Sequence, residues 1–454
     1  MPVDSCQRKT LLRPPAGDQQ LASNMLDDLS TRRLFLQRGL TLLAAGGTIP
    51  TFLDNTALAM MQAADGARTQ AATGKNGKIL VIVQLSGGND GLNTVVPYAD
   101  DAYHRARPAL AHKAADVLKI NDYIGLHPNL APVKELFDDD MMAIVQGVGY
   151  PNPNRSHFRS MDIWHSAEPE HETPTNGWLG RFFDNTCDGT DPHSGVNIGD
   201  SIPLAMRGSR VTPLSFEKPE NYKYAGRDRA GYERVNGIGE GKQHIDAATS
   251  KKQIEVATAD EQLQFLTRTA MDAQVSSDNI QRIAKNYQTS SRYPGGEFGQ
   301  GLRTIAAMIA GQLPTRVYYV SLGGFDTHAN QRGRHEQLLQ QFAAGVSAFW
   351  KDMKRQENED RVLMMTFSEF GRRVDQNASG GTDHGAAAPM FFFGKSVKGG
   401  VIGKHPSLTQ LDQGDLRYHI DFREAYASVL QQWMDAPSKP ILGQQFKPLQ
   451  ILRA

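Results

Sequence analysis

Five short apolar runs, each closed by glycine or polar residues, set the strongest limit on what this 454-residue chain can fold into. A near-continuous apolar run of this length is typical of a strand that is buried on both faces. Apolar side chains at three- and four-residue spacing predict helices over 130–137 and 335–353. Strands that alternate with helices predict an α/β fold, with a mostly parallel central sheet sandwiched by helices. The five runs are 78–85, 141–148, 316–322, 361–367 and 389–393.

Residues 184–300 do not follow this alternation. They contain turn residues and mixed charges, followed by one long helical pattern over 259–287. The apolar stripe on that predicted helix is typical of a packing face. We therefore expect a helical and loop insertion at 184–300 within one large domain that spans 60–454.

The N-terminal segment has the pattern of an export signal. Arg32 and Arg33 precede a weakly apolar stretch over 40–53, and small residues around Ala59 offer a cleavage site. This combination is typical of a twin-arginine signal peptide. We expect 1–59 to be leader and signal peptide, with translation starting at Met1 or at Met25.

Three expectations follow from this signal. The twin-arginine translocase is a partner during export, and the mature protein is periplasmic or secreted. The alternatives are a cytosolic helix or a membrane anchor, but Gly46, Gly47 and Pro50 make a stable span unfavourable. No other stretch reaches about 18 consecutive apolar residues, so no membrane span is expected in the mature chain.

Charge and cysteine content exclude two further features. The chain has 49 Lys plus Arg against 49 Asp plus Glu and no long basic run, which argues against a nucleic-acid partner. Cys6 lies in the predicted leader, so Cys187 is alone in the mature chain. An intramolecular disulfide is therefore not expected, and stability must come from core burial.

Acidic and histidine side chains follow the predicted strands. In sheets of this type, ligands bind beyond the carboxyl ends of the strands, so we expect these side chains to gather at one edge. Carboxylate oxygen and imidazole nitrogen are ligands that suit zinc and related metals. Metal binding is favoured over the alternative, a purely structural polar network, because such groups are costly to bury unpaired. The residues are Asp90, Asp326, His328, Glu369, Asp383 and His384.

Ser156 is the candidate nucleophile. It lies at the predicted start of a helix, shortly after the apolar run 141–148. A hydroxyl there gains from the positive end of the helix dipole, and Arg155 beside it can bind an oxyanion. The alternative is an ordinary helix-capping serine.

Taken together, several motifs resemble the DUF1501 family, and the resemblance covers nearly the whole mature chain. Members of that family typically begin with a twin-arginine signal and are placed with the alkaline-phosphatase and sulfatase-like superfamily. The resemblance therefore implies an alkaline-phosphatase-like fold with metals at the strand ends, but it implies no substrate. The motifs are LSGGNDGLNTVVP, NRSHFRSMDIWHSA, GWLGRFFD, GGFDTH, SEFGR and GTDHG.

The resemblance also implies a role for individual residues. Ser156 resembles the nucleophile, and Arg155 or Arg159 would neutralise the transferring group. The superfamily usually spaces its paired Asp and His ligands more widely than 326 and 328, so His335 is a competing ligand. Phe370 stands where a His usually follows the acidic ligand in the superfamily. The site would therefore hold either one metal ion or two. The residues implied as ligands of zinc, manganese, magnesium or calcium are Asp90, Asp326, His328, Glu369, Asp383 and His384.

The leading functional hypothesis is an exported, metal-dependent hydrolase. Its substrate would be a small-molecule or glycan ester of phosphate, sulfate or a related acid, attacked by Ser156. The alternative is a non-catalytic binding or assembly protein of the cell envelope that keeps the sulfatase-like fold, and Phe370 favours that alternative. A redox protein ranks last, because the sequence has no Cys-rich cluster or dinucleotide-binding loop.

Overall fold

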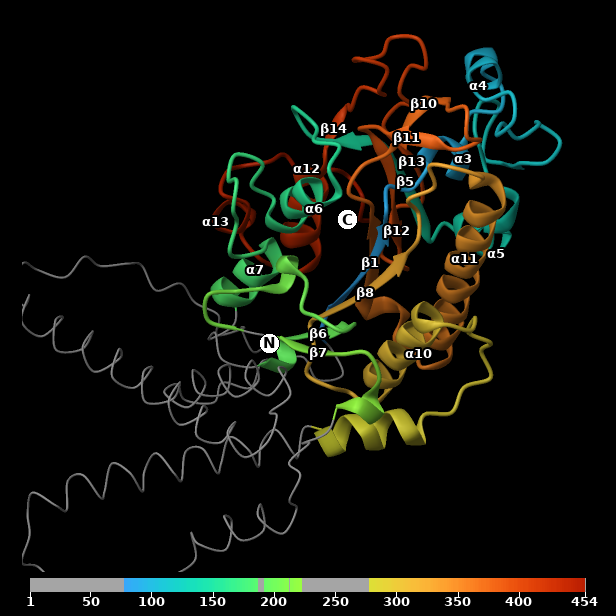
Figure 1. The fold of residues 1–454 in the computed structure, drawn as a ribbon. Helices are drawn as coiled ribbons and strands as arrows, with labels where there is room; N and C mark the ends of the chain where they lie inside the picture. The colour runs from blue at the N-terminus through green and yellow to red at the C-terminus, as the bar shows by residue number, and fades with distance from the viewer. Residues whose placement is uncertain (1–76, 187–191, 212, 223–276, 454) are drawn as a thin grey trace, which may run out of the picture. The chain divides into compact units, whose positions relative to one another are not determined.

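A central sheet of nine strands organises the described part of the chain (Figure 1). The computed structural model describes residues 77–186, 192–211, 213–222 and 277–453. The strand order is β13–β5–β12–β9–β1–β8–β6–β7, and β14 pairs with β5. The strands are β1 Ile79–Ser86, β5 Met142–Gly149, β6 Gly195–Ile198, β7 Leu214–Phe216, β8 Val317–Gly323, β9 Val362–Phe367, β12 Ala388–Phe393, β13 Gly400–Ile402 and β14 Ile420–Asp421.

Paired strands of this sheet are parallel except at β12. The central strand β1 pairs in parallel with β8 and β9. β12 is antiparallel to both of its neighbours, β5 and β9, so β5 and β9 run in the same direction. The carboxyl ends of β1, β5, β8 and β9 therefore lie at one edge of the sheet. The five apolar runs all form strands, and the predicted mostly parallel sheet is confirmed.

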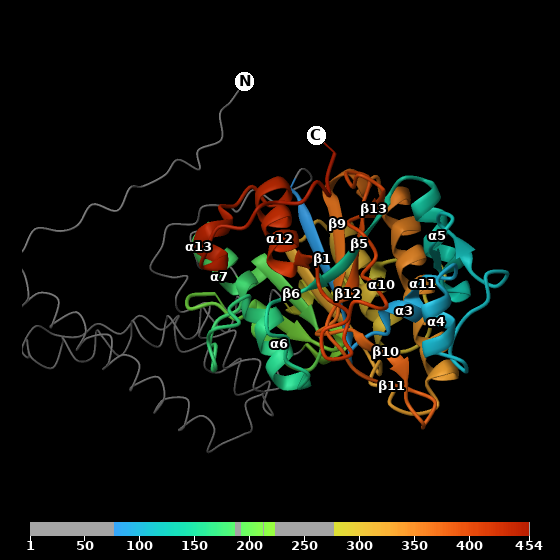
Figure 2. The same ribbon diagram turned by 90° about the horizontal axis from the view of Figure 1, so that it is seen from above.

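Helices cover both faces of the sheet (Figures 1 and 2). Alternate residues of β1 enter different cores: Val81 belongs to the same core as Phe342 on one face, and Leu80 belongs to the same core as Phe182 on the other. This alternation is why the run had to be apolar throughout. The predicted sandwich is confirmed. One face carries α5 Ala131–Asp138, α10 Glu297–Ala310 and α11 Gln331–Arg355, and the other carries α6 His157–Ser166, α7 Trp178–Thr186, α12 Phe422–Ser428 and α13 Ser438–Leu442.

The helix predicted over 335–353 begins earlier, at Gln331. Asn330 before it has a left-handed backbone (φ 48°), which separates the helix from the preceding loop. Gln331 and His335 are polar yet buried, because they hydrogen-bond to Asp90 and Asn89 after β1. The apolar period could not include these residues, since a partner distant in sequence decides their burial.

The range predicted as an insertion contributes to the central sheet. β6 and β7 lie inside 184–300 and extend the sheet beyond β8. They are short, so their local patterns did not mark them as strands. Residues 277–286 are helical, in line with part of the helix predicted over 259–287. The leader at 1–59 and residues 223–276 lie outside the described residues, and the domain boundaries stay predictions.

Within the described ranges, no helix has both the length and the apolar character needed to cross a membrane.

Candidate metal centre

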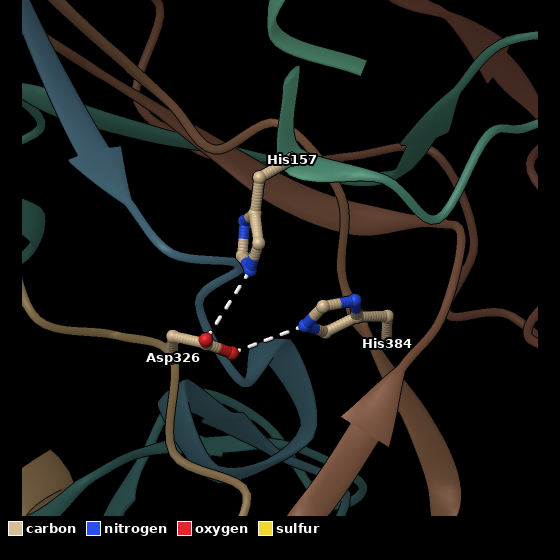
Figure 3. Close-up of side chains that lie close together, drawn as sticks. All are labelled: His157, Asp326 and His384. Atoms are coloured by element: carbon tan, nitrogen blue, oxygen red, sulfur yellow. Dashed lines mark hydrogen bonds and ion pairs between the residues drawn. The ribbon is translucent and has the colours of Figure 1, made fainter. Parts of the chain in front are cut away.

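His157, Asp326 and His384 converge at the edge where the parallel strands end (Figure 3). Asp326 follows β8, His157 is the first residue of α6, and His384 ends the short strand β11 (Thr382–His384). One possible ligand atom from each residue lies within 4.8 Å of the other two. His157 Nε2 is 3.3 Å from Asp326 Oδ2, and His384 Nε2 is 3.0 Å from Asp326 Oδ1. We call these three residues the metal triad.

Glycines allow the backbones of the site to approach one another. Gly87, in the turn after β1, has φ +117°, and a Cβ there would lie 2.4 Å from the backbone nitrogen of Asp326. A Cβ on Gly381 would lie 2.3 Å from the backbone carbon of His328. Both positions therefore require glycine, since any side chain would push apart the loops that carry the donor atoms.

His157 is oriented by a buried carboxylate. Its Nδ1 lies 2.8 Å from Glu369 Oε1, which also accepts a 2.8 Å hydrogen bond from Gly87 N. A carboxylate only accepts, so Nδ1 carries the hydrogen and Nε2 is directed at Asp326. The hydrogen bond to Glu369 raises the pKa of His157, and Nε2 has a longer contact of 3.3 Å to Asp326 Oδ2. The arrangement favours positive charge at this ring, which a proton or a metal ion can supply.

His384 is oriented in the same way by a backbone carbonyl. Its Nδ1 lies 2.8 Å from the carbonyl oxygen of Arg155, which can only accept. Burial lowers the pKa of His384, so the neutral ring is favoured and its Nε2 has a lone pair. That lone pair faces the carboxylate of Asp326 at 3.0 Å. Two acceptors at this distance repel unless a cation lies between them, so the donor set fits a metal ion.

His328 lies beside the metal triad. Its Nε2 is 3.0 Å from Asp326 Oδ1 and 2.8 Å from His384 Nε2. These separations are close to the spacing of about 3.3 Å between ligands of a tetrahedral zinc ion with bonds of about 2.0–2.1 Å. Asp383 is 3.5 Å from the other ring nitrogen of His328 and so lies outside the group of donor atoms.

Asp90 does not join the metal triad. Its carboxylate forms a buried ion pair with Arg107 at 2.5 Å and accepts a hydrogen bond from Gln331. Burial raises the pKa of Asp90, but Arg107, His335 and these hydrogen bonds bring it below its usual value. His335 is also committed elsewhere, because its Nε2 is 3.0 Å from Asn89 Oδ1. Neither residue belongs to the candidate metal-binding group found among the described residues.

Glu369 and Phe370 shape the wall of the site. Glu369 lies behind His157 rather than among the donor atoms. Phe370 is buried, and its ring centroid lies 4.9 Å from that of His157 and 4.5 Å from that of His384. An apolar ring thus packs against both imidazoles at the position where the resemblance implied a histidine ligand.

The predicted catalytic residues have different environments. Ser156 is exposed at the N-cap position of α6, but its side chain makes no capping hydrogen bond. The Arg155 guanidinium binds Asp415, with Nε 2.8 Å from Oδ2, so Arg155 reaches the triad through its backbone carbonyl. Arg159 instead donates to the carbonyls of Pro169 and His171. It is directed at the loop after α6.

Comparison with known proteins places the chain in a family. A family model described as "Protein of unknown function (DUF1501)" matches residues 77–431. The chain belongs to the DUF1501 family. The predicted resemblance is therefore confirmed. A search of curated proteins finds no match for this DUF1501 chain.

Solved structures resemble this DUF1501 protein only distantly. One is the PsFucS1 sulfatase from Pseudoalteromonas sp., with 10% identity, coverage of 87% of this chain and 74% of that chain, and a TM-score of 0.36. A protein in the alkaline phosphatase superfamily from Vibrio parahaemolyticus has 9% identity, with coverage of 88% of this chain and 78% of that chain and a TM-score of 0.35. A phosphonate monoester hydrolase of Agrobacterium radiobacter has 8% identity, with coverage of 81% of this chain and 78% of that chain and a TM-score of 0.34. At these identities and TM-scores, no residue's role passes from them to this chain.

His157 is the member of the triad that the sequence prediction does not include. Ser156 beside it has the stronger local signal, because a hydroxyl at the start of a helix is a candidate nucleophile. A signal was present: His157 follows β5, whose carboxyl end lies at the same edge as those of β8 and β9. A histidine at that edge belongs with the other predicted donors of this DUF1501 protein.

Replacing Glu369 by Gln is expected to weaken zinc binding by about 10- to 100-fold, because outer residues that orient a ligand affect affinity on this scale. The substitution keeps an oxygen that can accept from Gly87 N but removes the charge that favours a cation at His157. Competition with a chromophoric chelator measures the affinity. Glu359→Gln, on a surface ion pair with Lys395, is the control. An unchanged affinity in Glu369→Gln would show that Glu369 does not orient a ligand.

Proposed function

We propose that this chain is an exported, metal-dependent hydrolase of a phosphate, sulfate or related ester of a small molecule or glycan. The observation that carries the proposal is the convergence of the metal triad. Two imidazoles have their Nδ1 atoms fixed by Glu369 and Arg155, and both Nε2 atoms are directed at the carboxylate of Asp326. An anchored imidazole with its second nitrogen directed at a shared carboxylate is the arrangement of metal ligands in proteins.

We propose one ion rather than two, with zinc favoured over manganese, magnesium and calcium. Imidazole nitrogens suit zinc, whereas magnesium and calcium prefer oxygen ligands. Arg107 neutralises Asp90, and Phe370 packs beside the two histidines of the triad. Asp90 Oδ1 has no hydrogen-bond partner among the described residues, but the ion pair with Arg107 disfavours a second cation beside it, and Phe370 offers no donor atom.

The proposed chemistry uses groups at the start of α6. A bound divalent ion would polarise the ester and favour ionisation of a nearby hydroxyl or water. Ser156 is next to His157 in the chain, is exposed, and does not use its hydroxyl to cap the helix. Its oxygen would attack the phosphorus or sulfur atom as the bond to the alcohol oxygen breaks and the alcohol takes a proton from solvent, and water would then cleave the ester on Ser156 and release phosphate or sulfate. Asp415 binds Nε and Nη2 of Arg155, whose side chain is 37% exposed, so Nη1 would bind an oxygen of the transferring group.

The decisive test uses the exported protein loaded with zinc and a panel of phosphate monoesters, phosphate diesters and sulfate esters. We expect turnover of at least one class, and near-background turnover in Ser156→Ala. Ser201→Ala is the matched control, since Ser201 is exposed and its hydroxyl contacts Asp200. Zinc binding without turnover of any ester would instead support the non-catalytic envelope protein.

We also propose export through the twin-arginine translocase to the periplasm or the medium, on the pattern at Arg32 and Arg33. These residues lie outside the described part of the chain. Replacing both arginines by lysine should leave the precursor in the cytoplasm. Normal export of that variant would contradict the proposal.

A further inference from the structure

His328 brings a fourth donor atom to the metal triad. Its Nε2 lies 2.8 Å from His384 Nε2 and 3.0 Å from Asp326 Oδ1, comparable with the 3.0 and 3.3 Å contacts that Asp326 makes inside the triad. Four protein ligands close a tetrahedral zinc site, whereas a catalytic site keeps one position for water or substrate. A zinc ion held by all four residues can bind a substrate only if one of these ligands leaves.

The three histidines are anchored unequally. Short contacts of 2.8 Å fix the Nδ1 atoms of His157 and His384, and the carboxylate on His157 is only 1% exposed. For His328, the corresponding contact to Asp383 is 3.5 Å, which is longer than a normal hydrogen bond, and the Asp383 side chain is 57% exposed. His328 is also the most exposed of the three histidine side chains, at 45%. Its ring is therefore the least constrained.

The backbone of His328 is fixed even though its ring is not. Its carbonyl accepts a 2.9 Å hydrogen bond from Asn377 Nδ2, and the backbone of Gly381 packs directly against it. Departure of the ring therefore needs a change of rotamer, not an opening of the loop. Exposed side chains make such changes on the picosecond to nanosecond scale.

Charge decides which group can replace His328. Arg372 is buried and donates to Asp326 Oδ1 at 2.9 Å, which adds a positive charge next to the triad. A divalent ion together with Arg372 exceeds the combined negative charge of Asp326 and Glu369, and the third nearby carboxylate, Asp383, is 57% exposed and therefore screened by solvent. An anionic oxygen is therefore favoured over a neutral one at the vacated position.

We propose that His328 is an exchangeable fourth ligand that completes the site at rest and is displaced by a phosphate or sulfate group. This inference rests on the proposed function, because it needs an ion held by His157, Asp326 and His384. It deepens that function by assigning the site to anionic esters. It also gives His328 a role different from that of the two anchored histidines.

The test counts the imidazole ligands of the zinc-loaded full-length protein by X-ray absorption, with and without inorganic phosphate. We expect three imidazoles without phosphate and two with it. His328→Ala should show two in both conditions and should bind phosphate about tenfold more tightly in a calorimetric titration, since no ligand has to leave. His171→Ala, which removes an exposed histidine, should match the wild-type protein.

The outcomes separate this inference from the proposed function. Two results would overturn the exchange of His328. One is three imidazoles in the wild-type protein both with and without phosphate. The other is phosphate binding to His328→Ala that is no tighter than phosphate binding to the wild-type protein. Failure of the wild-type protein to bind zinc would overturn the metal site and this inference together. Zinc binding with exchange of His328 but no ester turnover would contradict the hydrolase and leave the exchange supported.

Discussion

Zinc binding is expected to be lost on replacement of Asp326 by Asn, with an affinity at least about 100-fold below that of the wild-type protein. Among the residues that the structure describes, the side chain of Asp326 alone has ion-pair contacts to all three imidazoles, through Oδ2 to His157 and Oδ1 to His384 and His328. Burial raises the pKa of Asp326, but the hydrogen bond and the positive charge of Arg372 hold it below its usual value, so the residue is ionised. Asn has only one carboxamide oxygen and no negative charge. Its NH₂ group would also donate a hydrogen bond to the histidine Nε2 lone pair that the metal ion needs.

This loss is not expected to come from unfolding. Asp326 is 47% exposed, and Arg372 keeps its hydrogen bonds to the carbonyls of Gly87, Gly88 and Phe325 without it. Thermal unfolding of the metal-free proteins checks this point. Asp383→Asn is the matched control and should change zinc affinity by less than about tenfold, because its contact to His328 is long. Wild-type affinity in Asp326→Asn would refute the metal centre.

The largest loss of stability is expected from Arg107→Met. Arg107 and Asp90 are fully buried, and the substitution leaves the carboxylate of Asp90 without its ion-pair partner. Removing one member of a buried pair typically costs about 3–5 kcal/mol in the free energy of unfolding. Urea unfolding at neutral pH measures it. Lys134→Met breaks an exposed pair with Asp138 and should cost less than about 1 kcal/mol.

The pH dependence of this variant has a defined sign. In the wild-type protein the pKa of Asp90 is lowered, so its ion pair stabilises the fold above the pKa of the unfolded chain, and this stability is lost as the pH falls through the folded value. Without Arg107, burial raises that pKa instead. The stability gap between variant and wild type should therefore narrow as the pH falls from about 7 toward about 4. Adding Asp90→Asn to Arg107→Met removes the unpaired carboxylate and should restore part of the lost free energy of unfolding. A double variant that is no more stable than Arg107→Met would contradict the pairing of Arg107 with Asp90.

Local patterns were sufficient for the sheet and not for the site. The run at 78–85 identifies its strand because each of its residues meets an apolar core on one face or the other. The position of Asp326 at the strand edge also follows from the sequence. Asp90 has the same local signal, yet it faces Arg107. Which carboxylate meets the histidines depends on guanidinium groups supplied by other segments, and no spacing rule contains that information.

Glu369 lies at the predicted strand end but has a role that its position does not reveal. The sequence places it correctly at the end of β9, beside the other donors. Its carboxylate is nevertheless taken by Gly87 N and by His157 Nδ1. The sequence gives residue type and strand edge, whereas the order of contacts around an ion depends on side-chain packing across the whole sheet.

The donors of the metal triad come from segments that are far apart in the chain, and β11 supplies the last of them. A nascent polypeptide that ends before β11 holds His157, Asp326 and His328 but cannot place His384 against them. Only the exchangeable His328 then adds to the two remaining donors, so tight binding of the ion is expected to require synthesis of residue 384. Newly made protein that is stalled before residue 384 should bind zinc more weakly than the full chain.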